Sequence, residues 1–481
     1  MLLLLSLLLV LFLLCWIFQK RFEQMLVPFV SALMLAIYPF ALAQRLDAFV
    51  FFACGAAMFL LVWASVLCFR QKIKFASLPR LICTPGFVCF ALLTAFLYIG
   101  SVPRMVWWGD DIRYWALQPK SLYLSGGFLN GTMSLLPDFA AYMPGMPLFQ
   151  WLGLAIFGEW HEGILFFMLW LFWLVLIIPF AERITWKKAY WSPLFMVFAI
   201  ALPTILNSPS YSFLGVDTAL GLCFGYILCQ LWQLRAPQGD TAFRYTCLCL
   251  SLCVLVLLKQ TGLLLFVLSI SFLPFCLRGK AKPFALKPLL CTYLPPLLLV
   301  LSWFVFCRCN GLGGMHSSAL FQHLNELLTG TWVPPAGYDQ LLPSLWSALF
   351  SGRLSTPEHA LTEIPSLYRM LFLCIAPLLL IQLFRQSKRD MKGLSLWAGL
   401  VFLIELAGFY FSFATIFYTE VGEYVGEGLF LLPLMIERYF CPIAFGLAML
   451  CLSLLLDSLK GISKQKNALL TAFALVALVL L

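Results

Sequence analysis

Two adjacent carboxylates, Asp110 and Asp111, follow a tryptophan pair in a polar stretch that interrupts a largely apolar sequence. Carboxylates beside lipid are costly unless they are paired or bind an ion, so this pair is the first candidate for chemistry. One of them can act as a general base toward an acceptor hydroxyl or amine, or the pair can hold a divalent metal, Mg²⁺ or Mn²⁺. The position next to Gly109 favours Asp110 as the essential member, and Asp111 remains the alternative.

The stretch that carries this pair contains further polar side chains. Arg113 and Lys120 lie in the run 112–124, which is compatible with a helix, and Asp138 and Tyr142 lie beside a return that reads AYMPGMPLF. The two prolines and the glycine of this return favour a broken or re-entrant segment and not a full membrane span. We therefore assign Arg113, Lys120, Asp138 and Tyr142 to substrate binding.

Three polar positions later in the chain are expected at the same membrane face. Asp217 begins an apolar run, where it either faces a site or interacts with the positive end of a helix dipole. Lys259 lies in a tight turn and either contacts a lipid-linked phosphate or is a solvated turn residue. Arg438, followed by Tyr439, either clamps a phosphate with its planar guanidinium or pairs with the acids of the preceding loop. We assign Asp217, Lys259, Arg438 and Tyr439 to substrate binding.

Other polar residues are weaker candidates. Glu405 is an intramembrane carboxylate whose partner the sequence does not identify. His161, in GEWHEG, has no second histidine at the helical spacing of a zinc protease motif, so we expect it to begin a helix. His316 and His323 lie seven residues apart in a second polar loop and are candidates for acceptor binding. Cys307 and Cys309 offer a disulfide but only half of a zinc site.

The composition sets the class of protein that must position these residues. The chain has 481 residues, of which 63% are hydrophobic and 11% charged, and this balance excludes a soluble globular protein. Its net charge of +10 comes from short basic clusters between apolar runs, a pattern of cytoplasmic anchors and not of nucleic-acid binding. Most of the 17 cysteines lie inside apolar runs, where a thiol acts as a small hydrophobic group.

The apolar runs and the basic clusters predict an all-α, polytopic membrane protein with about fourteen transmembrane helices. The basic clusters at 70–80, 183–188, 278–287 and 385–392 place those connections in the cytoplasm. The stretches 100–160 and 308–366 then become two large external loops, which we expect to carry short amphipathic helices. The expected spans are 2–18, 26–43, 51–69, 81–99, 163–181, 189–206, 214–234, 245–258, 262–277, 288–306, 367–384, 393–412, 438–456 and 467–481.

This topology divides the chain into five regions. Residues 1–99 hold four helices, 100–160 the first external loop with the acidic pair, and 161–307 helices five to ten. Residues 308–366 form the second external loop, and 367–481 hold the last four helices. The first helix has no positive segment before it and basic residues after it, so we expect an uncleaved anchor with its N-terminus outside.

An acidic pair soon after a membrane helix, an aromatic-rich amphipathic segment and a Pro-Asp and Pro-Gly-x-Pro-Leu return together resemble the first external loop of the GT-C class of integral membrane glycosyltransferases. That class includes the protein O-mannosyltransferases and the lipid A aminoarabinose transferases. The Asp-Asp pair differs from the Asp-Glu pair of the mannosyltransferases, and the acids here follow more helices than is common. The turn at Lys259 and the Glu-Arg-Tyr string at Arg438 are similar to elements of the same class.

The resemblance implies transfer of a sugar from a polyprenyl-phosphate donor, with inversion, to a glycan, lipid or protein acceptor outside a bacterial plasma membrane. Membrane lipids would be its other partners. The chemistry agrees with the residues, because carboxylates on one loop and Arg and Lys on others suit a base and a departing phosphate. Two alternatives remain. A polysaccharide polymerase or ligase would depend more on His316, His323 and Arg353, and a transporter would place its polar residues in broken helices at the mid-membrane.

Overall fold

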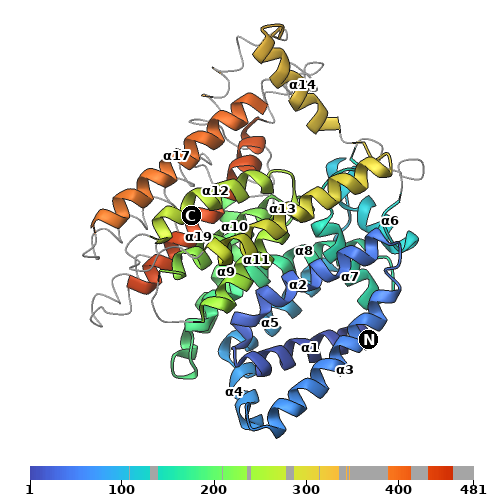
Figure 1. The fold of residues 1–481 in the computed structure, drawn as a ribbon, viewed down its shortest axis with the longest axis vertical. Helices are drawn as coiled ribbons and strands as arrows, with labels where there is room; N and C mark the ends of the chain where they lie inside the picture. Colours follow the sequence, from blue (N-terminus) through green and yellow to red (C-terminus); the bar gives the residue numbers. More distant parts are fainter. Residues whose placement is uncertain are drawn as a thin grey trace.

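The computed structural model describes residues 1–107, 109–129, 139–207, 210–235, 240–277, 286–313, 315–334, 343, 346, 388–412 and 432–458. Within these ranges the regular structure is entirely helical, and the long helices run side by side along one diagonal of the view in Figure 1. This confirms the all-α prediction for the part of the chain that the structure describes.

The helices up to the middle of the chain are α1 (Leu2–Phe18), α2 (Phe22–Leu42), α3 (Ala48–Phe69), α4 (Leu78–Ile82), α5 (Pro85–Ser101), α6 (Leu117–Ser125), α7 (Gly145–Phe157), α8 (Glu162–Ile177), α9 (Ser192–Leu206) and α10 (Asp217–Gln233). They are followed by α11 (Thr241–Leu258), α12 (Gly262–Leu277), α13 (Leu286–Cys309), α14 (Met315–Thr329), α17 (Lys388–Ser412) and α19 (Leu432–Ser458). Short helical turns are η1 (Phe75–Ser77), η2 (Asp111–Trp115), η3 (Ile178–Arg183) and η4 (Trp186–Trp191).

Seven of the described helices are long and apolar enough to cross a membrane, and a bent pair adds an eighth if it counts as one span. The hydrocarbon core of a bilayer is about 30 Å thick and needs about 20 helical residues. The helices α1, α12 and the apolar part of α19 are shorter than this threshold. The protein is therefore a multi-pass membrane protein, and every span predicted within the described residues except 81–99 overlaps one helix for most of its length. The predicted spans 367–384 and 467–481 lie outside the described residues.

The fourth predicted span, 81–99, is wrong as a single straight helix. The segment Phe75–Ile82 and helix α5 meet at a bend of 53°. Thr84 between them is extended, and its side chain accepts a hydrogen bond from the backbone N–H of Phe87. Pro85 explains the break, because a proline lacks an N–H and disfavours the helical conformation of the residue before it.

The segment 100–160, which the sequence pattern predicts to be an external loop, contains short helices, as expected. Residues 111–115 form one π-helical turn, and α6 follows it. The proline-rich return leads into α7, which has 13 residues, too few to span a bilayer. Every residue from Gly145 to Leu154 is nevertheless buried, and α7 packs against α2, α6, α8 and α11. A short buried helix of this kind fits the expected re-entrant segment.

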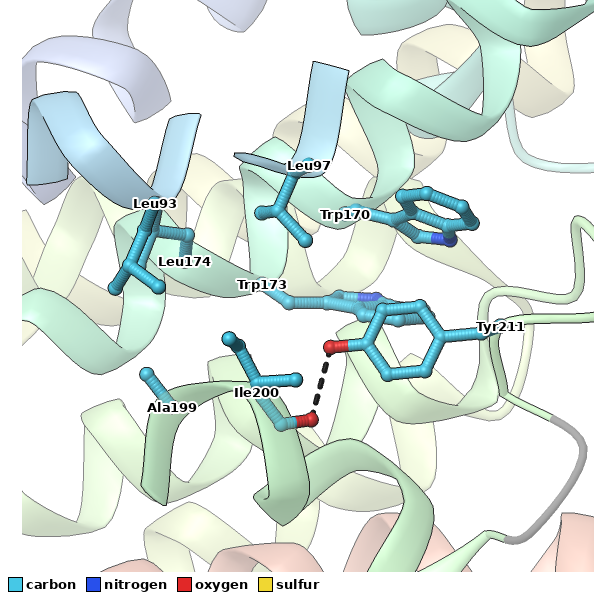
Figure 2. A pocket seen from close by; sticks show the side chains of 8 residues that line it. All are labelled: Leu93, Leu97, Trp170, Trp173, Leu174, Ala199, Ile200 and Tyr211. Atoms are coloured by element: carbon cyan, nitrogen blue, oxygen red, sulfur yellow. Dashed lines mark hydrogen bonds between the residues drawn. The ribbon is translucent and has the colours of Figure 1, made fainter. Parts of the chain in front are cut away.

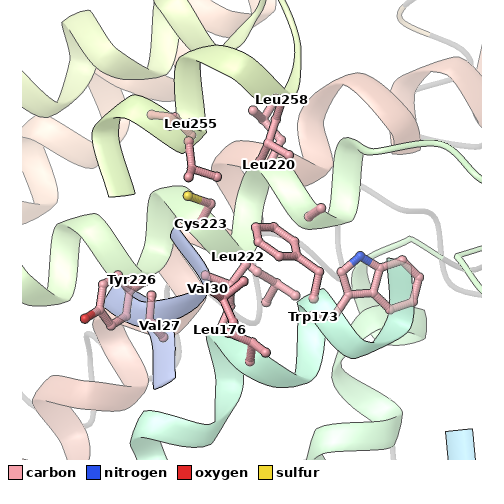
Figure 3. Packing of buried hydrophobic residues seen from close by; sticks show 14 of the residues in the cluster. Val27, Val30, Trp173, Leu176, Leu220, Leu222, Cys223, Tyr226, Leu255 and Leu258 are labelled. Carbon is pink, nitrogen blue, oxygen red and sulfur yellow. The ribbon is translucent and has the colours of Figure 1, made fainter. Parts of the chain in front are cut away.

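Helix α10 lies at the centre of the bundle and packs against α8, α11, α12 and α19. Almost all its residues are buried, although it has only 17. Figure 3 shows the packing around it, with side chains from α2, α8, α10 and α11 meeting. The labelled side chains are those of Val27, Val30, Trp173, Leu176, Leu220, Leu222, Cys223, Tyr226, Leu255 and Leu258.

Glycines allow α10 and α19 to approach closely. A Cβ on Gly221 would lie 2.7 Å from the Cα of Pro442, and one on Gly225 would lie 2.6 Å from the Sδ of Met449. The two glycines are four residues apart and so share one helix face, as small residues do in close membrane-helix pairs. Because the contacts advance in the same direction along both helices, α10 and α19 run parallel and place Asp217 beside Arg438.

Candidate functional site

Arg438 lies between two carboxylates that come from distant parts of the chain. Its Nη1 donates a hydrogen bond to the Oδ2 of Asp110 at 3.3 Å, and its Nε lies 3.5 Å from the Oδ2 of Asp217. Asp110 precedes the π-helical turn, Asp217 is the first residue of α10, and Arg438 lies one turn before Pro442 on α19. The parallel contact of α10 with α19 therefore brings Asp217 and Arg438 together, and Asp110 reaches Arg438 from the segment before α6.

Lys259 completes the charged cluster. Its Nζ donates a hydrogen bond of 2.5 Å to the Oδ1 of Asp217, and its side chain is 14% exposed. The solvated-turn alternative for Lys259 is therefore wrong. The turn between α11 and α12 is tight because a Cβ on Gly262 would lie 2.2 Å from the backbone oxygen of Leu255. This tightness keeps Lys259 near the α10 end and not out in solvent.

The two cations explain how a carboxylate is tolerated in the protein interior. The side chain of Asp217 is only 2% exposed, and an unpaired buried charge is very costly. Lys259 pairs with the Oδ1 of Asp217 and Arg438 with its Oδ2, so the two cations together compensate the negative charge. Helix α10 begins at Asp217, as the helix-start alternative predicts. The same carboxylate also pairs with Lys259 and Arg438.

Asp111 points to a different partner than its neighbour. Its Oδ2 accepts a hydrogen bond of 2.8 Å from the backbone N–H of Leu214, and its Oδ1 is buried without a hydrogen-bond partner. The residue is 1% exposed. Burial raises the pKa of the Asp111 carboxyl to about 7, although the Leu214 N–H and Arg438 oppose this shift. Asp111 therefore ties the π-helical turn to the segment before α10.

That segment, residues 210–216, contributes to the cluster in ways the sequence reasoning missed. The Arg438 guanidinium lies over the ring of Phe213 at 5.4 Å, a cation–π distance. Leu214 contributes only its backbone N–H. A sequence does not show which phenylalanine ring or backbone N–H will contact a charged group. In this segment the sequence pattern therefore predicted only the neighbouring Asp217.

Aromatic contact also links Tyr439 to the cluster. The Lys259 Nζ lies 5.2 Å from the centre of the Tyr439 ring, which in turn lies 5.8 Å from the ring of Phe409 on α17. Glu405, also on α17, attracts Lys259 electrostatically. Lys259 is thus a positive charge near enough to Glu405 to interact with it electrostatically.

The other predicted binding residues have different surroundings. Arg113 is exposed on the π-helical turn. The Lys120 Nζ lies 5.1 Å from the ring of Trp160, and the ring of Tyr142 packs edge-on against Tyr114 at 4.7 Å. Asp138 lies outside the described residues. The contacts shown for Lys120 and Tyr142 are thus with aromatic side chains of the first loop and its neighbourhood.

Local contacts account for His161, His323 and the cysteine pair. His161 caps α8, because its Nδ1 accepts a hydrogen bond from the N–H of Gly163, which confirms the predicted helix start. His323 pairs with Glu326 at 3.1 Å on α14. Cys307 and Cys309 are free thiols, so the disulfide alternative is wrong. His359, Arg353 and the acids Glu420, Glu423 and Glu427 lie outside the described residues.

The acidic pair does not form a ready set of metal ligands. The Asp110 carboxylate faces Arg438 and the Asp111 carboxylate faces Leu214, so the neighbouring acids diverge. Within the described ranges no group of three His, Cys, Asp or Glu side chains is arranged to hold a metal ion.

A small apolar pocket lies beside the 210–216 segment and helps to hold it. Figure 2 shows Tyr211 beside Trp170 and Trp173, with its hydroxyl donating a hydrogen bond to the backbone oxygen of Ile200 at 3.0 Å. The pocket has a volume of about 10 Å³, which is room for about one water molecule. It is too small for a sugar or a lipid chain, so we interpret it as an anchor for the segment.

The cluster combines groups with distinct capacities. Asp110, whose side chain is 53% exposed, is accessible from solvent, whereas Asp111 and Asp217 are buried. Arg438 and Lys259 supply positive charge of the kind that binds phosphate.

Comparisons of the chain with protein-family models, with curated proteins and with solved structures find no match.

Proposed function

We propose that this protein is a membrane glycosyltransferase of the GT-C class, with about fourteen transmembrane helices. In this proposal it moves a sugar from a polyprenyl-phosphate donor to a glycan, lipid or protein acceptor on the external face of a bacterial plasma membrane. The observation that carries the proposal is the meeting of Arg438, Lys259, Asp217 and Asp110 at one place. An exposed carboxylate beside two cations suits this reaction better than it suits a transport path, which would lie deeper between helices.

Each group has a role in the proposed reaction. Asp110 accepts the proton from the acceptor hydroxyl or amine while the oxygen or nitrogen of that group forms a bond to the anomeric carbon of the sugar. The bond from the anomeric carbon to the phosphate oxygen breaks, and its electron pair stays on the polyprenyl phosphate. Arg438 and Lys259 stabilise the charge that grows on this phosphate. Asp217 holds both cations in place, and attack from the face opposite the phosphate inverts the configuration.

The decisive assay follows radiolabelled polyprenyl-phosphate sugars with the purified full-length protein in detergent. We expect the wild type to consume at least one donor and Asp110→Asn to lower turnover by roughly 10² to 10⁴, the usual scale for a general base. Arg438→Lys keeps the charge but loses the planar two-point contact, and should cost about a hundredfold, on the order of 3 kcal/mol.

Arg45 and Asp47 provide matched controls for these substitutions. They form an exposed pair at 3.3 Å, the same distance as between Arg438 and Asp110. Arg45→Lys and Asp47→Asn should leave turnover unchanged. A wild-type protein that neither binds nor consumes any donor of this class would refute the proposal, and a fully active Arg438→Lys variant would remove Arg438 from the phosphate site.

A further inference from the structure

The two carboxylates beside Arg438 are held very differently. Asp217 is 2% exposed and has a second cationic partner, Lys259, whereas the Asp110 side chain is 53% exposed. Among the described residues, the ion pair shown for Asp110 is the one with Arg438. Exposed ion pairs are weak because water screens them, and buried pairs with a second partner resist separation. Of the two carboxylates that contact Arg438, Asp110 is therefore the one that another anion can replace.

A phosphate is a stronger partner for this arginine than Asp110 is. The donor's phosphate is a diester with one negative charge shared by two free oxygens, and these can accept two parallel hydrogen bonds from a guanidinium. The contact with Asp110 is a single hydrogen bond of 3.3 Å. The Nε of Arg438 faces the buried Asp217 at 3.5 Å, so the side of the guanidinium that an anion can take over is the one that contacts Asp110. An anion that reaches Arg438 thus competes against one long, exposed contact.

We propose that Arg438 exchanges Asp110 for the donor's phosphate, so that donor binding releases the base. Before the donor binds, Arg438 holds the Asp110 carboxylate through a hydrogen bond and keeps it from turning toward the acceptor. Once the phosphate occupies Arg438, Asp110 is free to turn toward the acceptor. Asp217 and Lys259 keep Arg438 in position during the exchange. This inference rests on the proposed function and adds an order to it, with the donor before the acceptor.

The exchange is measurable without turnover. A water-soluble carbodiimide with an amine modifies accessible carboxylates, and mass spectrometry reports the fraction modified at each position. The probe is farnesyl phosphate added to the purified full-length protein in nanodiscs, and farnesol, which has the same chain without the phosphate, is the matched ligand. We expect farnesyl phosphate to raise modification of Asp110 severalfold and farnesol to leave it unchanged. Asp47, paired with Arg45, should respond to neither ligand.

Variants at Arg438 separate the exchange from a general loosening of the loop. In Arg438→Gln, modification of Asp110 should be high from the start and insensitive to farnesyl phosphate. Arg438→Lys retains the buried charge beside Asp217 and should give an intermediate response if Arg438→Gln does not fold. A response of Asp110 in Arg438→Gln equal to that of the wild type, or an equal rise with farnesol, would overturn the inference.

A separate binding measurement distinguishes the two proposals. Displacement of radiolabelled farnesyl phosphate by polyprenyl phosphate reports whether the phosphate site exists. If the probe binds in an Arg438-dependent way while modification of Asp110 stays constant, the exchange is wrong and the phosphate site stands. If no lipid phosphate binds, the proposed function fails together with the exchange.

Discussion

Burial of one carboxylate gives the charged cluster a pH dependence. Asp111 is held by the Leu214 N–H in an interior position, and desolvation raises its pKa to about 7. An aspartate in an unfolded chain has a pKa of about 3.9. Between these two values the folded protein keeps a proton that the unfolded chain has lost. The contribution of Asp111 to stability is therefore fully present below about pH 4 and is lost as the pH rises toward about 7.

The thermal stability of Asp111→Asn tests this assignment. Asparagine keeps an oxygen that can accept the Leu214 N–H but has no proton to lose, so the variant should lack this part of the pH dependence. Each pH unit is worth up to about 1.4 kcal/mol for a single group. Melting temperatures in detergent from about pH 5 to about pH 8 should fall more steeply for the wild type than for the variant. Parallel curves would show that Asp111 does not titrate in this range.

Among the helices, the contact between α10 and α19 determines where the charged side chains of the cluster lie relative to one another. Asp217, Gly221 and Gly225 follow each other at four-residue steps on α10, and Arg438 and Pro442 do so on α19. The close approach at the two glycines therefore fixes the height at which Asp217 meets Arg438. The catalytic proposal depends on this packing as much as on the charged side chains themselves.

Alanine substitutions along this contact should have graded effects. At Gly221 the new Cβ would meet the backbone of Pro442 at 2.7 Å, which cannot yield easily, and overpacking of this kind costs about 1 to 3 kcal/mol. At Gly225 it would meet the flexible side chain of Met449, so the cost should be smaller. The melting temperature and the affinity for farnesyl phosphate should both fall more in Gly221→Ala than in Gly225→Ala.

Gly399 on α17 is the control for this series. A Cβ there would have no atom within 4 Å, so Gly399→Ala adds only helix propensity, worth up to about 1 kcal/mol in favour of the folded state. Its melting temperature should equal or exceed that of the wild type. Equal losses of lipid phosphate binding in all three variants would contradict the idea that the α10–α19 contact positions the cluster.

At the scale of the whole molecule, the cluster and a second polar group lie at opposite ends of the bundle. Arg438 begins the apolar part of α19, while Asp457 near its other end pairs with Arg183 at 3.1 Å. The Glu182 carboxylate accepts a hydrogen bond from Gln24 near the start of α2. The basic connections that the sequence pattern assigns to the cytoplasm, such as η4, therefore lie away from the proposed site.

Labelling of single cysteines from each side of the membrane tests this orientation. In a protein depleted of its own thiols, including the exposed Cys83, Cys291 and Cys309, we expect His323→Cys to react with an impermeant reagent added outside. Lys188→Cys should react only after the cytoplasmic face is opened. Reaction of position 188 from outside would invert the topology and place the charged cluster in the cytoplasm.

The sequence by itself determines the class of the protein and the individual candidates. Apolar runs of about 20 residues specify membrane helices whatever their neighbours are, because lipid requires each segment to satisfy its own backbone hydrogen bonds. Proline marks breaks in the same local way, although the bend at Thr84 was missed. Asp110, Asp217, Lys259 and Arg438 were recognisable because charged residues stand out at the ends of apolar runs.

Only the tertiary structure decides which of these residues meet. Asp110 and Arg438 are 328 residues apart, and Lys259 and Asp217 are 42 apart, so no helical periodicity relates them. Their contacts follow from the close packing of α10 with α19 and from the tight turn after α11. The roles of Phe213 and of the Leu214 N–H could not be read from the sequence, because a ring or a main-chain donor acquires its function only from the groups packed against it.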